Sequence, residues 1–231
     1  GAEDDEEDDE MVVVFPNFGP NQMRVLKQQI ALYDRYAARS VDDVMREISA
    51  GARKVNAIAV GDHDVYVACR AAKGYGFSVW TTDLKFEDPR QIVQGLVGCC
   101  GQMDVQATGD ELWVAENSKH RVVQFDRTGK ELMSFGKRDR DGVADGFGGC
   151  CNPMNLCFNQ AGELLVSESN GVVKHFSKQG EYLGLIGVAG VQPGCKNSAI
   201  GVTADGERVF YVDIHQSKVI VLSRADAAPA E

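Results

Sequence analysis

The sequence predicts an all-β fold, a β-propeller of four-stranded antiparallel blades, of which four are recognisable. One observation behind this prediction is an internal repeat, in which a short run of β-forming residues contains a bulky residue followed directly by Val. Each repeat also divides into short alternating runs separated by Gly, Asn and Asp turns, which is the hairpin signal. Four antiparallel strands in about 45 residues are typical of a propeller blade. The aligned bulky residues are Tyr66, Trp113, Leu165 and Tyr211, at spacings of 47, 52 and 46 residues.

Residues 1–10 form the first segment, an acidic tail. Positions 3–10 carry eight of the 34 acidic residues of the chain and no basic residue. Like charges at this density repel one another, so we expect a solvated, disordered tail. Without these eight acids, 26 acids face 24 bases, and the net charge changes from −10 to −2. A nearly neutral fold disfavours nucleic-acid binding, and no apolar run approaches the roughly 18 residues of a membrane-spanning helix.

Residues 11–50 form the second segment, a strand followed by a helical arm. We expect residues 11–15, Met-Val-Val-Val-Phe, to form a strand that completes the last blade, since that repeat lacks a clear fourth strand. Ser40 is placed to cap a second helix and Gly51 to end it. We expect the helices to cover an edge or face of the propeller; the alternative is an arm that forms a homo-oligomer. The apolar residues on the helical faces are Leu26, Ile30, Tyr33 and Ala37, then Val41, Val44, Met45 and Ile48.

Residues 51–225 form the propeller repeats, and residues 226–231 form a C-terminal tail. The second repeat is the clearest of the four. Its expected strands cover residues 103–107, 112–115, 121–126 and 131–135. The third repeat has the same order, with strands expected over 154–158, 164–167, 172–177 and 182–186. The fourth repeat has three such runs, so its blade is incomplete unless another segment supplies a strand.

The second repeat also resembles a known family. The run Trp113-Val-Ala-Glu-Asn-Ser-Lys-His-Arg-Val-Val-Gln-Phe-Asp, followed by Gly129, resembles the central signature of NHL repeats. Pro153 is similarly placed to the proline before the innermost strand in that family. The resemblance covers about residues 52–224 and implies a propeller, usually of about six blades. It implies little about function, because NHL propellers serve as RNA binders, protein-interaction modules, lyases and secreted proteins.

The cysteines are the main candidates for chemistry. There are seven, an odd number, and no Cys-x-x-Cys pair. Five of them lie in aligned segments that open the second, third and fourth repeats. Equivalent loops of neighbouring blades are neighbours around the propeller axis, so we expect their sulfurs to cluster at one mouth of the central channel. The candidate binding residues at this rim are Cys99, Cys100, Met103, Cys150, Cys151, Met154 and Cys195.

Three chemistries compete for this cluster. The first is disulfide bonding, either between adjacent blades or between vicinal cysteines. The bridge we expect first joins the second and third blades, from Cys99 or Cys100 to Cys150 or Cys151. The second is a thiolate metal site, since soft sulfur ligands suit copper, zinc or an iron–sulfur centre. The third is a set of buried thiols that act as small apolar residues. The candidate metal ligands are Cys99, Cys100, Cys150, Cys151 and Cys195, whereas we expect Cys69 and Cys157 to be structural.

The other motifs favour structure over catalysis. We interpret three acids that follow the second strands as structural turn residues, namely Glu116, Glu168 and Asp213. The four histidines do not align between repeats, which disfavours a tri-histidine zinc lyase. They are His63, His120, His175 and His215. We expect residues 137–149 to form a solvated loop whose Gly-rich part is a turn or exposed lid, and no hydrolase elbow or P-loop is present.

These observations predict a non-enzymatic binding or scaffold module whose partner is a protein or small ligand on a propeller face. The alternative is a metal-binding or redox protein that uses the thiol cluster. A second alternative is a propeller lyase or hydrolase with an unrecognised site. The chain begins at Gly1, which we interpret as a sign of processing, and we expect a periplasmic or secreted location.

Overall fold

The computed structural model describes residues 52–71, 76–99, 102–141, 144–192 and 198–223. The predicted tails over 1–10 and 226–231, the predicted strand and helical arm over 11–50, and Cys100 and Cys195 lie outside these residues. The described residues form 17 strands and one short 3-10 helix, so the fold they define is all-β, as predicted. They include no helix long and apolar enough to cross a membrane.

The strands form four antiparallel blades, each ordered as in the sequence. Blade 1 contains β1 (Ala52–Val60), β2 (Asp64–Ala71), β3 (Phe77–Asp83) and β4 (Arg90–Leu96). Blade 2 contains β5 (Asp104–Thr108), β6 (Glu111–Glu116), β7 (Arg121–Asp126) and β8 (Glu131–Phe135), with the 3-10 helix η1 (Asn117–Lys119) after β6. Blade 3 contains β11 (Asn155–Phe158), β12 (Leu164–Ser167), β13 (Val172–Phe176) and β14 (Tyr182–Val188). Blade 4 has three described strands, β15 (Ser198–Val202), β16 (Arg208–Asp213) and β17 (Lys218–Ser223).

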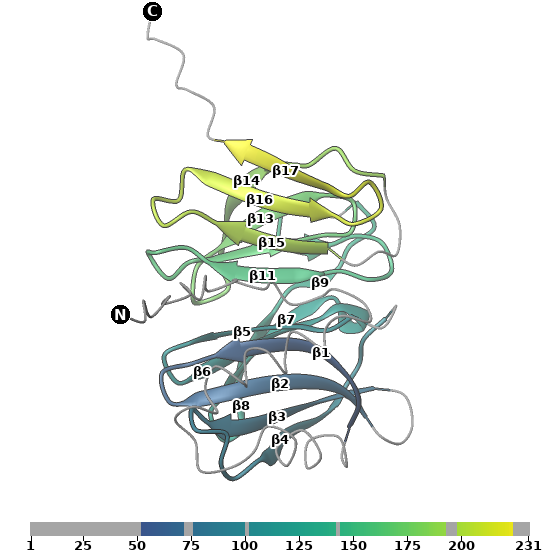
Figure 1. Cartoon of the computed structure of the whole chain (residues 1–231). Coiled ribbons are helices and arrows are strands. Elements are labelled where there is room, and N and C mark those ends of the chain that lie inside the picture. Colours follow the sequence, from purple (N-terminus) through teal and green to yellow (C-terminus); the bar gives the residue numbers. More distant parts are fainter. Residues whose placement is uncertain (1–51, 72–75, 100–101, 142–143, 193–197, 224–231) are drawn as a thin grey trace, which may run out of the picture.

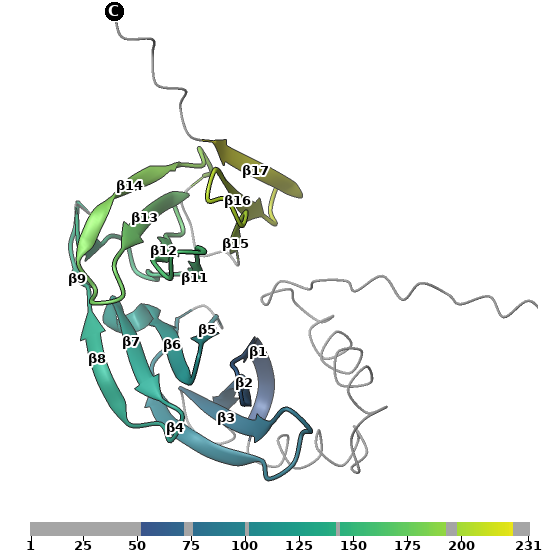
Figure 2. The same cartoon turned by 90° about the vertical axis from the view of Figure 1, so that its left-hand side faces the viewer.

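The blades are arranged as in a β-propeller. The innermost strands β1, β5, β11 and β15 contact one another in that order. Figure 1 shows blades 3 and 4 above blades 1 and 2, and Figure 2 shows the four blades as an arc with blade 1 at one end and blade 4 at the other. Hairpin turns join the strands of a blade, and glycines at positive φ occupy them, as at Gly109 (φ 58°) and Gly129 (φ 88°).

Apolar side chains from the second strands fill the space between blades. Leu112 and Val114 of β6 pack with Tyr66 of blade 1. The alternate residues of β6, Trp113 and Ala115, point the other way and pack against blade 3. Because side chains alternate along a strand, each second strand supplies both faces of its blade.

The predicted equivalence of Tyr211 with Trp113 is wrong by one residue. β6 and β16 are both six residues long and begin at matching positions, so Phe210 corresponds to Trp113. Tyr211 instead packs toward blade 3 with Leu165, and its hydroxyl donates to the carbonyl oxygen of Glu168 at 3.2 Å. Phe210 and Tyr211 are both bulky, and only the packing direction distinguishes them.

The connection between blades 2 and 3 is more ordered than predicted. β9 (Lys137–Arg138) and β10 (Gly146–Phe147) pair in parallel within it. Phe147 is fully buried and packs in the core shared by blades 2 and 3. The prediction of an exposed lid is therefore wrong for residues 146–148, whereas Lys137 and Arg138 are exposed as expected.

Candidate thiol site

Three cysteine sulfurs from two neighbouring blades converge, as the sequence predicted. Cys99 lies before β5, the innermost strand of blade 2, and Cys150 and Cys151 lie before β11 of blade 3. The Sγ atom of Cys151 is 2.8 Å from that of Cys99 and 3.1 Å from that of Cys150. All three sulfurs lie within 4.8 Å of one another. Cys151 is buried, Cys99 is half-buried and Cys150 is exposed, so solvent reaches the site from one side.

The loop that carries Cys99 is held by residues at the end of β6. The backbone N–H of Val97 donates to Glu116 Oε1 at 3.0 Å, and that of Cys99 donates to Asn117 Oδ1 at 2.7 Å. The Asn117 side chain also donates to the carbonyl oxygen of Gln102 at 3.1 Å. Glu116 is fully buried and pairs with Arg121 at 2.6 Å. These bonds fix the backbone of the loop on both sides of Cys99.

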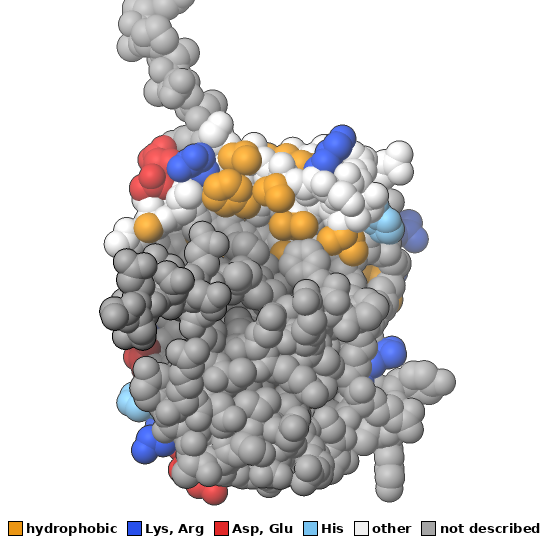
Figure 3. Space-filling model, viewed as in Figure 1, with side chains coloured by type: hydrophobic (Ala, Val, Ile, Leu, Met, Phe, Trp, Pro, Cys, Tyr) orange, Lys and Arg blue, Asp and Glu red, His pale blue; other side chains and the backbone are white. Residues whose placement is uncertain are grey.

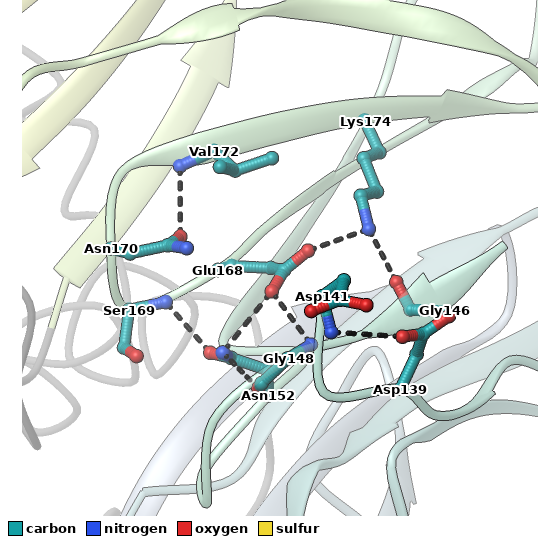
Figure 4. A network of polar contacts seen from close by, with 10 residues as sticks. All are labelled: Asp139, Asp141, Gly146, Gly148, Asn152, Glu168, Ser169, Asn170, Val172 and Lys174. Carbon is teal, nitrogen blue, oxygen red and sulfur yellow. Dashed lines mark hydrogen bonds and ion pairs between the residues drawn. The ribbon is translucent and has the colours of Figure 1, made fainter. Parts of the chain in front are cut away.

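The loop that carries Cys150 and Cys151 is held in the same way by the end of β12. The N–H of Gly148 donates to Glu168 Oε2 at 3.0 Å, and the Asn152 side chain bridges the loop to Glu168 and to the N–H of Ser169. Lys174 pairs with Glu168 at 2.7 Å. Figure 4 shows the Glu168 carboxylate between Lys174 on one side and Asn152 and Gly148 of the loop on the other. Glu116 and Glu168 are therefore structural residues as predicted, but their carboxylates accept bonds from the preceding cysteine loops, so the prediction that they act within their own turns is wrong.

The two loops are also joined to each other. The Gln102 side chain of blade 2 donates to the carbonyl oxygen of Met154 in blade 3 at 3.2 Å. We call the buried acid at the end of the second strand, with its bonds to the cysteine loop, the clamp of that blade. Blade 1 has neither a clamp nor a cysteine loop, because Cys69 occupies the position of the acid and no cysteine precedes β1. The clamp and the thiols therefore occur together in blades 2 and 3.

The other predicted site residues have different surroundings. Met103 and Met154 are fully buried, and Met103 packs in the core between blades 1 and 2. Cys69 and Cys157 are buried as predicted. Burial raises the pKa of the Cys69 thiol to about 12 and that of Cys157 well above its ordinary value. These two thiols stay protonated at neutral pH and suit packing better than metal binding.

The described histidines do not assemble a second site. His63 pairs with Asp110 at 2.7 Å on the surface, and His175 pairs with Glu163 at 2.8 Å. Within the described part of the chain, the three cysteines are the one group of at least three His, Cys, Asp or Glu side chains close enough to share a metal ion.

A cleft between blades 3 and 4 is a feature that the sequence did not indicate. Its volume is about 410 Å³, which is within the range of small-ligand sites. Leu185, Leu222 and other apolar side chains line it, and His175, Asp205 and Glu207 supply polar groups. The lining residues come from six strands, β12 to β17, and from adjoining turns, so no local motif marks the cleft.

The sulfur positions fit two kinds of chemistry. Two sulfurs bound at 2.3 Å to one tetrahedral ion lie about 3.8 Å apart, so a shared ion requires the Cys99 and Cys151 sulfurs to separate by about 1 Å. A disulfide requires them to approach to about 2.05 Å instead. None of the described cysteines forms a disulfide. A metal ion uses all three converging sulfurs, whereas a disulfide uses two.

Comparisons with known proteins assign this chain to no family. No protein-family model and no curated protein matches this chain. A crystal structure of a eukaryotic initiation factor matches with a TM-score of 0.38 and 15% identity, over 75% of this chain and 44% of the other. Hydrazine synthase of Kuenenia stuttgartiensis matches with a TM-score of 0.44 and 16% identity, over 72% of this chain and 49% of the other. This chain therefore spans about half the length of the solved structures that it matches.

Proposed function

We propose that this protein is a non-enzymatic binding module whose thiol site takes a soft metal ion, Cu(I) or Zn²⁺. The observation that carries the proposal is the convergence of three sulfurs from two blades within 4.8 Å. Thiolates prefer such ions over hard cations. The NHL character of the blades and the predicted extracytoplasmic location are parts of the same proposal.

The buried acids that hold the two cysteine loops, Glu116 and Glu168, support the assignment of a metal site. A metal site needs its ligands held close together before the ion arrives, and residues beyond the ligands supply that order. Glu116 holds the backbone two residues before Cys99, Glu168 holds it two residues before Cys150, and both acids are almost fully buried. Cys100 and Cys195 remain predicted further ligands by their positions in the sequence.

A second candidate function is a redox link between blades 2 and 3. The distance of 2.8 Å between Cys99 and Cys151 favours it, because a small movement brings the two sulfurs to bonding distance. Oxidation would release two protons and two electrons to an oxidant such as a disulfide or O₂. This reaction competes with metal binding, because a disulfide sulfur is no longer a thiolate.

Metal titration under reducing, anaerobic conditions tests the proposal. The full chain is titrated with Cu(I) in one arm and Zn²⁺ in another, each against a chromophoric chelator of known affinity. In the titration with the metal that the site binds naturally, we expect one ion to bind per chain. Cys99→Ser and Cys151→Ser are each expected to weaken binding by at least about 100-fold, since each removes a ligand.

Cys69→Ala is the matched control, because it removes a buried thiol far along the sequence from both loops. It is expected to bind the metal as the wild type does. Reduced protein that binds neither ion, or binding that is unchanged in Cys151→Ser, contradicts the proposal. Loss of two thiols on oxidation, with a peptide that links Cys99 to Cys151, identifies the redox function instead.

A further inference from the structure

Blade 4 exposes an apolar sheet face on the side away from blade 3. Phe210 of β16 is directly opposite Val221 of β17, and Val212 is opposite Val219. These four side chains lie on one face, because the residues between them, Tyr211 among others, pack toward blade 3. Val219 is 61% exposed and Val221 is 49% exposed. Figure 3 shows apolar side chains gathered over this blade.

The same face is a buried interface in blade 2. By strand register, Phe210, Val212 and Val219 correspond to Trp113, Ala115 and Val122. All three of the blade 2 residues are fully buried against Leu156, Leu164 and Val166 of blade 3. Blade 4 therefore carries one half of an interface that the molecule uses between its other blades.

No described blade is free to supply the other half. Blades 2, 3 and 4 use their matching faces against the preceding blade. The matching face of blade 1 contains Val65 and Val67, which are 3% and 2% exposed. A partner for the blade 4 face would therefore come from outside the described blades.

We propose that this face of blade 4 packs against the same face of a second copy of the chain. The face is self-complementary, because two cross-strand pairs of apolar side chains can stack on an identical pair as sheets do in a sandwich. One end of the face has the exposed turn acids Asp205 and Glu207 beside Arg208, and the other end has the exposed Lys218. A two-fold axis across the strands places each Lys218 near the acidic turn of the partner, and an isologous contact of this kind closes as a dimer.

Sedimentation velocity of the full, reduced chain from 1 to 100 µM tests this proposal. We expect a concentration-dependent dimer in the wild type and at least a tenfold weaker dimer in Val219→Glu, since the substitution buries a charge in the contact. Leu132→Glu is the matched control, because Leu132 is 48% exposed on β8 of blade 2. It introduces the same charge and is expected to leave the dimer unchanged.

Three results would overturn the proposal. The first is a wild type that stays monomeric up to 100 µM. The second is a dimer that persists in the Val219→Glu, Val221→Glu double variant. The third is a full chain that is monomeric while a chain without residues 11–15 dimerises, since the predicted strand would then be the occupant. The metal titration is independent of each of these results, so the two proposals fail separately.

Discussion

The ammonium group of Lys174 lies 2.7 Å from Glu168 in the interior of blade 3, where both side chains are at most 2% exposed. The same ammonium donates to the carbonyl oxygen of Gly146, and Glu168 accepts from the N–H of Gly148. One buried ion pair thus connects β13, β12 and the loop that carries Cys150 and Cys151. Two buried charges tolerate this environment only because each has a partner.

Removing one member of this pair is expected to be costly. Lys174→Met leaves the Glu168 carboxylate buried without its countercharge, and such a change typically costs about 3–5 kcal/mol in the free energy of unfolding. The double variant Lys174→Met, Glu168→Gln is expected to lose less than the sum of the two single changes. Urea unfolding of all four proteins measures the coupling, and additive losses would show that the pair does not interact.

A second prediction concerns the contact between the outer parts of blades 1 and 2. A methyl group at Gly129 would lie 2.0 Å from the carbonyl oxygen of Ile92, and Gly129 has φ 88°. Gly129→Ala is expected to cost at least about 3 kcal/mol, because strain adds to backbone displacement.

Gly109→Ala is the control for Gly129→Ala. Gly109 also has positive φ, but nothing lies within 4 Å of the added methyl group. Only the backbone penalty of about 1–2 kcal/mol remains there. Thermal or urea unfolding distinguishes the two, and equal losses would mean that the close approach to Ile92 is absent in solution.

A third prediction concerns pH. Burial raises the pKa of Asp104 to about 7, although hydrogen bonds from Leu156 and Asn155 oppose the shift. Between about pH 4 and pH 7 the folded protein keeps a proton that the unfolded chain releases. Stability therefore falls as pH rises through this window, by about 4 kcal/mol in all, and is level above it.

Asp104→Asn tests the source of this slope. The amide is neutral at every pH, so the variant is expected to lose the slope and to be more stable than the wild type at pH 8. Asp126→Asn is the control, since hydrogen bonds from Thr128 and Lys130 lower the pKa of that exposed acid and keep it charged in this window. A slope that survives in Asp104→Asn would assign it to another group.

The repeat was predictable because its signals are local. Alternation along β6 and β7 and the turns at Gly109 and Gly129 lie within one blade, so the sequence displays them directly. The direction in which Tyr211 packs is not local, since it depends on which neighbouring blade meets β16. The sequence Phe210-Tyr211 offers two bulky residues in succession, and choosing between them requires the register.

The site was predictable in the same partial way. Aligned loops on adjacent blades brought Cys99 and Cys151 together as topology requires. The clamps were not predictable, because Glu116 and Glu168 bond to backbone groups 19 and 20 residues earlier in the chain. Such contacts depend on the direction in which each side chain points, and the spacing of residues in the sequence does not determine that direction. The apolar face of blade 4 could not be predicted either, because it depends on which side chains of β16 and β17 point away from blade 3.

The last prediction concerns which thiols react. In the folded, reduced and metal-free protein at pH 8, we expect iodoacetamide to modify Cys150 well before Cys69 or Cys157. Cys150 is exposed, whereas Cys69 is fully buried. Alkylation requires the thiolate, and a pKa of about 12 leaves roughly one in 10,000 Cys69 side chains ionised at pH 8. Peptide mass spectrometry after timed quenching measures the reaction at each cysteine. The same reaction in urea is the control, in which all seven cysteines should react at similar rates. Cys69 and Cys157 pack in separate blades. If both are labelled as fast as Cys150 in the folded protein, neither core excludes solvent as described.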